Sequence, residues 1–344
     1  MLASFWFCLV VLAVLSGCTK DVGVQSVHLS GATMGTTYHV TVVSDVEIEN
    51  VAVLQAQIDE SLRRLNQQVS TYIDDSEING LKKVPINEWV TISKSVEDIL
   101  VTSLMVSEWS GGAFDVTLRP LIDLWGFGPS KSLDQVPDAG TINSALLGVG
   151  FNHLQLDTEQ HQLRRKAPVD LDFSAVAKGY GVDQVAAVLE QNGVTNYLVE
   201  IGGEMRLRGH SAKGKPWMIA VERPQTNLTQ QVYKAISLTD IAMATSGDYR
   251  NYFEQNGQRY SHTIDPRTGR PITHNLASVT VLHSSAAMAD ALATAFSVMG
   301  VEQARLLANS KGIAALFINK EEDGFSERSS DAFKPYLLTA KSAP

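Results

Sequence analysis

The chain has 344 residues, of which 44% are hydrophobic and 19% charged, a composition typical of a soluble globular protein with a sizeable core. Its formal net charge is −9 and no block of basic residues is present, so an electrostatic grip on nucleic acid is not expected. The two cysteines, Cys8 and Cys18, both lie in the N-terminal segment, which excludes cysteine-ligated zinc, iron–sulfur clusters and cysteine nucleophiles from the body of the protein.

The N-terminal segment has the pattern of an export signal. Residues 1–17 carry no charged side chain, and the apolar run from Phe5 to Leu15 is too short for a bilayer span of about 20 residues but suits a signal peptide. The run ends in Leu-Ser-Gly before Cys18 and resembles a bacterial lipobox, so we expect cleavage before Cys18 and lipidation of that residue. Several acyl chains would anchor the protein durably. An ordinary secretory signal is the alternative, and Thr19 leaves the choice of membrane open.

After this segment, apolar residues at helical spacing and short β-branched runs predict a mixed fold. In chain order we expect a strand at His39–Val43, helices at Val51–Asn66 and Val96–Trp109, a connection at Gly128–Ala139, a helix at Asp183–Gln191, a strand at Trp217–Val221, a connection at Gln225–Gln231, a strand at Ala277–Leu282 and a helix at Ala286–Met299. Because strands and helices do not alternate regularly, an α+β fold is favoured over a doubly wound sheet.

The usual nucleotide-binding fingerprints are missing. Gly209–Lys215 has the spacing of a phosphate-binding loop, but Pro216 stands where a Ser or Thr would hold Mg²⁺. The segment also lies between candidate strands rather than before a helix, so we predict a hairpin turn there. Gly148-Val-Gly150 lacks the third glycine of a dinucleotide-binding turn.

Clusters of small, polar and acidic residues run through the rest of the chain. They are Gly31–Thr37, Ser70–Tyr72, Gly112–Asp115, Pro120–Gly128, Asp170–Tyr180, Glu200–Glu204, Ala244–Arg250, Ser261–Gly269 and Ala289–Ala295. Each one alone has an ordinary structural explanation as a turn or a helix cap. Together and in this order they resemble the ApbE family of FAD:protein FMN transferases, from about Gly31 to Gly312.

This resemblance implies a fold, a reaction and a location. The expected fold is T-fold-like, with two subdomains of antiparallel sheets and packed helices. The expected organisation is a signal peptide (1–17), a lipidated Cys18 with its tether (18–29), the transferase domain (30–335) and a tail (336–344). The implied reaction is Mg²⁺-dependent transfer of the FMN moiety of FAD to a Thr hydroxyl, with release of AMP. The implied acceptors are subunits of Na⁺-translocating NADH:quinone reductase and of Rnf-type complexes, at the periplasmic face of the inner membrane.

Asp290 and Thr294 are the candidate metal ligands. They are four residues apart in an alanine-rich helical stretch, so their side chains share one face. Mg²⁺ prefers a few hard oxygen ligands together with water and substrate phosphates. The resemblance adds a backbone carbonyl from the segment that precedes Lys178, and we choose Ala175 over Ala177.

His262 is the candidate general base. A nearby carboxylate, Asp265, is expected to orient its imidazole and to tune it towards neutral pH. The resemblance also places His262 at the active site, among the residues that bind the flavin nucleotide, although Asp290 could share or hold the role of base. Ile264, two residues on, would face the same side of a strand and line the flavin site.

The remaining candidates would bind the flavin nucleotide. Met34 and Tyr72 offer an adaptable apolar contact and a stacking ring, and the run Ala113, Phe114 and Asp115 offers close backbone approach with one carboxylate. Asp172 and Lys178 flank the carbonyl ligand, and Lys178 would neutralise phosphate or hydrogen-bond the flavin. For Met34, Tyr72 and Phe114 the alternative is ordinary core packing.

Two other functions remain open at this point. A Mg²⁺-dependent FAD pyrophosphatase giving FMN and AMP would use the same groups with water as acceptor. In the family, hydrolysis is associated with a Tyr at a position that is Asn66 here, which favours transfer. A non-catalytic flavin-binding lipoprotein would not need Asp290, Thr294 and His262 together.

Overall fold

The computed structural model describes residues 24–45, 50–129, 135–222, 224, 232–247, 252–338 and 341–342. The predicted signal peptide, Cys18 and the connection Gln225–Gln231 lie outside the described residues. In the described residues, no helix has the length and apolar character needed to cross a membrane.

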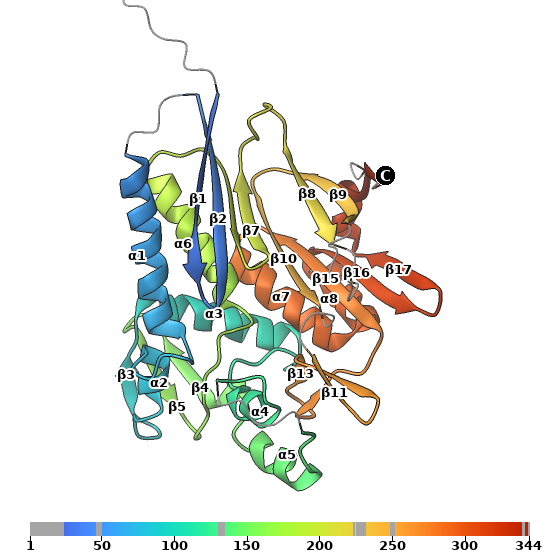
Figure 1. The fold of residues 1–344 in the computed structure, drawn as a ribbon. Coiled ribbons are helices and arrows are strands. Elements are labelled where there is room, and N and C mark those ends of the chain that lie inside the picture. Colours follow the sequence, from blue (N-terminus) through green and yellow to red (C-terminus); the bar gives the residue numbers. More distant parts are fainter. Residues whose placement is uncertain are drawn as a thin grey trace, which may run out of the picture.

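An antiparallel sheet of eight strands forms the centre of the fold (Figure 1). In spatial order its strands are β1 (Gln25–Thr33), β2 (Thr36–Ser44), β6 (Asn196–Ile201), β7 (Glu204–Arg208), β10 (Ile241–Gly247), β15 (Leu276–His283), β16 (Ala314–Glu321) and β17 (Gly324–Ser329). Strand alternation sends Tyr38, Val40 and Val42 of β2 into the core beneath the helices. Nearly all of β15 is buried because both faces of the sheet are covered at that point.

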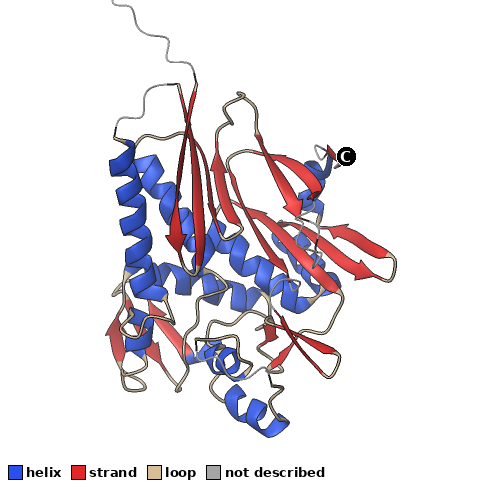
Figure 2. Cartoon of the chain, in the orientation of Figure 1, coloured by secondary structure: helices blue, strands red, loops and turns tan. Residues whose placement is uncertain are grey.

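Helices cover one face of this sheet, with α6 and α7 packed against each other and α3 and α1 beside them (Figures 1 and 2). The helices are α1 (Val51–Val69), α2 (Glu77–Leu81), α3 (Lys94–Trp109), α4 (Arg119–Leu124), α5 (Ala139–Leu146), α6 (Ala177–Gln191), α7 (Ala286–Met299), α8 (Val301–Lys311) and α9 (Lys334–Leu338), with 3-10 turns η1 (Phe151–His153) and η2 (Asp331–Phe333). Helix α7 is buried along most of its length.

The opposite face carries a smaller sheet. Its strands, in spatial order, are β18 (Lys341–Ser342), β9 (Val232–Leu238) and β8 (Trp217–Glu222). A second apolar core joins the two sheets, with Trp217 and Ile236 from the smaller sheet against Leu207 and Leu316 from the larger one. Phe333 of η2 closes this core.

Shorter elements lie below the main sheet in Figure 1. They are the sheet β3 (Trp89–Thr91), β5 (Gln162–Arg165) and β4 (Leu154–Asp157), and the hairpins β11 (Tyr252–Gln255) with β12 (Gln258–Ser261) and β13 (Ile264–Asp265) with β14 (Arg270–Pro271). Trp125, Phe253 and Tyr260 form an aromatic cluster there, and Trp125 Nε1 donates to Gly269 O at 2.8 Å. These contacts fix the two hairpins that flank His262.

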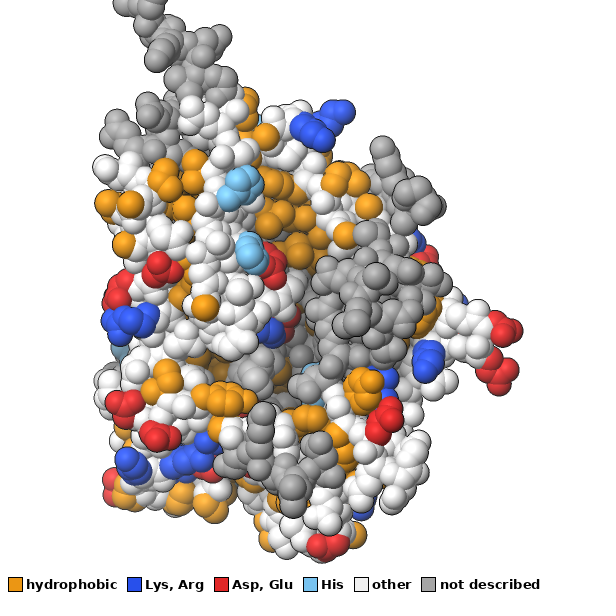
Figure 3. Space-filling view, viewed as in Figure 1, with side chains coloured by type: hydrophobic (Ala, Val, Ile, Leu, Met, Phe, Trp, Pro, Cys, Tyr) orange, Lys and Arg blue, Asp and Glu red, His pale blue; other side chains and the backbone are white. Residues whose placement is uncertain are grey.

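Each predicted helix and strand is confirmed, and so is the α+β class with antiparallel sheets. One local prediction is wrong. Gly209–Lys215 does form a turn, closed by Ser211 and Lys215, but it joins β7 and β8, which belong to different sheets, so it is not a hairpin. On the face shown in Figure 3, Lys and Arg side chains are scattered among acidic ones rather than gathered into a patch.

Candidate functional site

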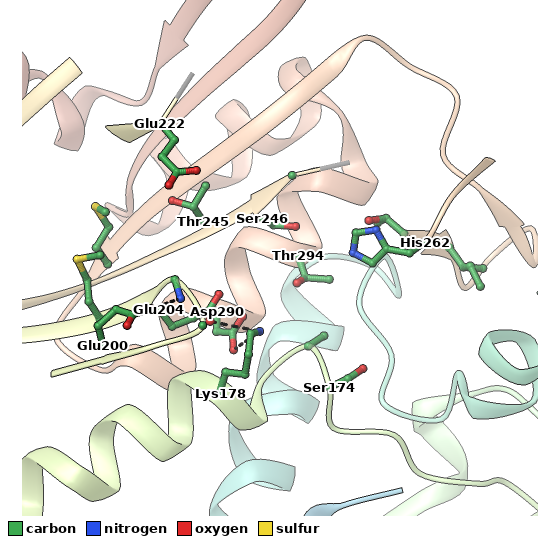
Figure 4. Close-up of a pocket in the computed structure, with 18 of the residues that line it drawn as sticks. Ser174, Lys178, Glu200, Glu204, Glu222, Thr245, Ser246, His262, Asp290 and Thr294 are labelled. Atoms are coloured by element: carbon green, nitrogen blue, oxygen red, sulfur yellow. Dashed lines mark hydrogen bonds and ion pairs between the residues drawn. The ribbon is translucent and has the colours of Figure 1, made fainter. Parts of the chain in front are cut away.

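A pocket of about 550 Å³ opens where the β6–β7 turn, the start of α6, the end of β10 and helix α7 meet (Figure 4). It is rich in polar and ionisable side chains. Those labelled in the figure are Ser174, Lys178, Glu200, Glu204, Glu222, Thr245, Ser246, His262, Asp290 and Thr294. They come from segments far apart in the sequence, so the tertiary fold assembles this pocket.

Helix α7 presents Asp290 and Thr294 to the pocket, one helical turn apart. Its first turn is held by Asp183 of α6, whose carboxylate accepts hydrogen bonds from Ala286 N and Ala287 N, each at 3.1 Å. The same carboxylate accepts from the hydroxyl of Ser285, the N-cap residue, at 2.8 Å and pairs with Arg206 at 2.8 Å. Asp183 therefore fixes where α7 begins and where its pocket face points.

Replacing Asp183 by alanine is expected to lower the free energy of unfolding by about 2–3 kcal/mol, because the first turn of α7 loses its carboxylate acceptor and the partly buried Arg206 loses the nearer of its two carboxylate partners. Urea unfolding measures the change. The matched control is Asp138→Ala, which removes the exposed cap of α5 and should lower the free energy of unfolding clearly less than Asp183→Ala does. Equal losses in the two variants would contradict the role given to Asp183.

Asp290 is buried, with 5% of its surface exposed, and is tied to the start of α6. Its Oδ2 accepts a hydrogen bond from Gly179 N at 2.9 Å and lies 3.8 Å from Lys178 Nζ. A Cβ on Gly179 would meet Ala286 O at 2.3 Å, so only glycine permits this approach of α6 to α7. The close crossing places Lys178 and Asp290 against each other.

Lys178 also lies 3.3 Å from Oε2 of the buried Glu204 (Figure 4). Burial by itself lowers the pKa of the Lys178 ammonium, but the carboxylates of Asp290 and Glu204 together raise it above its ordinary value. Burial raises the pKa of the Glu204 carboxyl group, and the neighbouring Lys178 ammonium opposes this shift. Lys178 therefore stays protonated, and because four carboxylates also line the pocket, its lining is acidic on balance and favours a divalent cation.

The segment before α6 supplies a candidate carbonyl ligand. Asp172 accepts from Ser174 N at 2.8 Å and from Ser174 Oγ at 2.5 Å, which folds a tight turn ahead of Ala175. Ala175 lines the pocket with Asp290 and Thr294. One carboxylate, one hydroxyl and one carbonyl fit the hard oxygen ligands of Mg²⁺. Among the described residues, no group of three His, Cys, Asp or Glu side chains is placed to hold a metal ion.

His262 lies between β12 and β13 on another wall of the same pocket (Figure 4). Its ring meets the edge of Phe127, with ring centroids 6.3 Å apart. The structure gives Asp265 another partner, and its expected pairing with His262 stays a prediction. The two Asp265 oxygens accept from Arg267 Nε at 2.9 Å and Nη2 at 2.8 Å, because the turn after β13 folds this guanidinium back onto the carboxylate.

The model of the family described as "ApbE family" matches residues 34–317. The chain belongs to the ApbE family. It is 44% identical over 327 residues to a protein of Vibrio cholerae named FAD:protein FMN transferase, covering 95% of this chain and 96% of that one. The structure of flavin transferase ApbE from the same organism superposes with a TM-score of 0.85 at 42% identity, covering 91% of this chain and all of that one. The apo flavinyl transferase ApbE of Pseudomonas stutzeri gives 0.83 at 40% identity, covering 91% of this chain and 97% of that one.

In this ApbE structure, six of the site residues predicted from the sequence line the pocket described above. They are Ala175, Lys178, His262, Ile264, Asp290 and Thr294. The others are not among its lining residues. Tyr72 is 70% exposed, whereas Ala113 and Phe114 are buried in or near the core, and Met34 packs against that core. That these residues and Asp172 bind the flavin nucleotide stays a prediction.

Asp115 is placed by its own segment. Its carboxylate accepts from Thr117 N at 2.8 Å and from Phe151 N at 2.8 Å, and burial raises its pKa above the ordinary value. Asp172 N donates a hydrogen bond to Val116 O at 2.8 Å, which connects this segment to the turn before Ala175. The candidate binding segments are therefore connected, although only some of them line the pocket.

Glu204 is a pocket residue that was not among the predicted site residues. The signal was present, since Glu204 closes the Glu200–Glu204 cluster directly after a Gly-Gly pair. Gly202 and Gly203 have φ values of 57° and 106°, a conformation that favours glycine. They form the turn that leads into β7, where Glu204 lines the pocket.

Proposed function

We propose that this protein catalyses Mg²⁺-dependent transfer of the FMN moiety of FAD to a Thr hydroxyl of an acceptor protein, with release of AMP. The chain is an enzyme of the transferase class, as are the named relatives that it matches over nearly its whole length. One observation supports Mg²⁺-dependent transfer of FMN to Thr. The candidate metal ligands Ala175, Asp290 and Thr294 line the same pocket as Lys178 and His262.

The chemistry needs positioning and charge neutralisation more than an enzyme nucleophile. Asp290, Thr294 and the Ala175 carbonyl would hold Mg²⁺, which when bound neutralises charge on the diphosphate. The Lys178 ammonium, which lies beside Glu204, binds a phosphate oxygen of FAD. As the hydroxyl oxygen of the acceptor Thr bonds to the FMN phosphorus, His262 accepts the hydroxyl proton. The bond between that phosphorus and the AMP oxygen breaks, and AMP leaves.

The cellular setting is part of the proposal. Lipidation of Cys18 would anchor the enzyme at the periplasmic face of the inner membrane, with residues 18–29 as tether. The proposed acceptors are subunits of Na⁺-translocating NADH:quinone reductase and of Rnf-type complexes. Flavinylation of such a subunit in cells that carry the Cys18→Ser variant, compared with wild type, tests whether the anchor is needed.

The direct test incubates the protein with FAD, Mg²⁺ and a purified Thr-containing acceptor domain, and measures acceptor mass. A gain of one FMN that EDTA abolishes is the expected result. Free FMN and AMP with an unmodified acceptor would instead identify a pyrophosphatase, and bound but intact FAD would identify a flavin carrier. Asn66, which donates to Thr33 Oγ1 at 3.0 Å, favours transfer through the family association.

Replacing His262 by alanine is expected to slow FMN transfer about a hundredfold at saturating FAD and Mg²⁺, because general-base catalysis contributes at least this factor. FAD affinity, followed by flavin fluorescence, should fall much less than the transfer rate. The exposed His210 in the β7–β8 turn provides the control variant His210→Ala, with an unchanged rate. A His262→Ala enzyme that transfers FMN at the normal rate would remove this residue from the mechanism.

A further inference from the structure

Glu204 is a buried carboxylate in the pocket to which the proposed reaction gives no role. Its side chain is 5% exposed, and its Oε2 lies 3.3 Å from Lys178 Nζ. The same ammonium lies 3.8 Å from Asp290 Oδ2, so one cation is shared between two carboxylates (Figure 4). The shared cation lies nearer to Glu204 than to the proposed metal ligand.

The backbone holds Glu204 in this position. It is the first residue of β7, after Gly202 and Gly203. A Cβ on Gly202 would lie 3.3 Å from Lys178 Cδ, so the turn packs along the lysine stem. The Gly202–Gly203 turn therefore brings the Glu204 carboxylate close to the Lys178 ammonium and leaves space for the lysine side chain.

The position of this ammonium matters for Asp290. An ammonium and a divalent cation compete for the same carboxylate, and two cations beside one buried carboxylate repel each other strongly. Asp290 Oδ2 already accepts from Gly179 N. Of the two carboxylates described above that pair with Lys178, only Asp290 would remain if Glu204 were removed. The Lys178 ammonium would then move onto Asp290.

We propose that Glu204 is a positioning residue that holds the Lys178 ammonium away from the Asp290 carboxylate, so that this carboxylate stays available to a divalent cation. This inference rests on the proposed metal-dependent function and adds to it a residue that acts through Lys178. Glu204 itself does not coordinate the cation.

The test is direct Mn²⁺ binding without FAD, measured from the free Mn²⁺ signal in electron paramagnetic resonance, on full-length protein in detergent. Glu204→Ala is expected to weaken Mn²⁺ binding about tenfold when Lys178 is present. In a Lys178→Met background the same substitution is expected to change the affinity less than twofold. This non-additivity is what a residue acting through Lys178 predicts.

The alternatives give different results. An equal loss in both backgrounds would show that Glu204 acts on the cation directly or only supports the fold, and no loss in either would also overturn the inference. Wild-type protein that binds no Mn²⁺ would refute the metal part of the proposed function and this inference with it. Wild-type binding without coupling would refute the inference alone.

Two further variants test whether the effect is specific to Glu204 and to its charge. Glu222→Ala removes another carboxylate from the pocket lining and should have the same small effect in both backgrounds. Glu204→Gln keeps the size of the side chain but removes its charge, so it should weaken Mn²⁺ binding about as much as Glu204→Ala does. A Glu204→Gln protein with wild-type Mn²⁺ affinity would contradict the proposal that the charge of Glu204 holds the ammonium.

Discussion

Replacing Asp290 by asparagine is expected to slow FMN transfer at least about a thousandfold, which corresponds to about 4 kcal/mol of lost transition-state stabilisation. The physical reason is that the amide is a poor ligand for Mg²⁺, while Lys178 and Glu204 remain in place. The amide oxygen still accepts from Gly179 N, as Asp290 Oδ2 does at 2.9 Å, so the contact between α6 and α7 is kept. The transfer rate is measured from acceptor mass over time.

Two further measurements separate loss of the metal from loss of the fold. Asp290→Asn should fail to bind Mn²⁺ while its urea-unfolding free energy stays within about 1 kcal/mol of wild type. Asp323→Asn, on the exposed turn between β16 and β17, is the control and should keep both properties. An Asp290→Asn enzyme that transfers FMN normally at saturating Mg²⁺ would contradict the metal site and the reaction built on it.

The secondary structure was most predictable where local signals agree. Helix α7 has the predicted bounds, Ala286–Met299, because an alanine-rich run begins at the N-cap Ser285 and ends at Gly300. Helix α6 starts earlier than predicted, at Ala177 rather than Asp183. Its first turns contain Gly179 and Gly181, which weaken the helical signal locally. The packing against α7 overrides that weakness.

The pocket was much less predictable from the residues themselves. Asp290 and Thr294 share a helix face, which spacing alone reveals, but their meeting with Lys178 and His262 depends on tertiary packing between distant segments. The family resemblance, not the periodicity, supplied that set. Asp265 also has a partner, Arg267, that the sequence pattern did not indicate. Arg267, only two residues away, is a stronger and nearer partner for this carboxylate than an imidazole.

Replacing Gly179 by alanine is expected to destabilise the protein and to disrupt the pocket together. The added Cβ would lie 2.3 Å from Ala286 O and 2.8 Å from Asp290 Cβ, and neither atom belongs to a flexible side-chain end. Helices α6 and α7 must then move apart, which should lower the free energy of unfolding by about 3 kcal/mol. Urea unfolding measures this loss.

The same displacement should reach the chemistry, because Gly179 N holds Asp290 and its neighbour Lys178 holds the phosphate in the proposed reaction. We therefore expect Mn²⁺ affinity and the rate of FMN transfer each to fall at least about tenfold even under conditions where the variant is folded, since small misplacements of reacting groups are costly. The matched control is Gly80→Ala in α2, where a Cβ meets nothing within 4 Å, and which should be neutral or slightly stabilising. If Gly179→Ala matched Gly80→Ala in stability and in Mn²⁺ affinity, the close crossing of α6 and α7 would not be what positions Asp290.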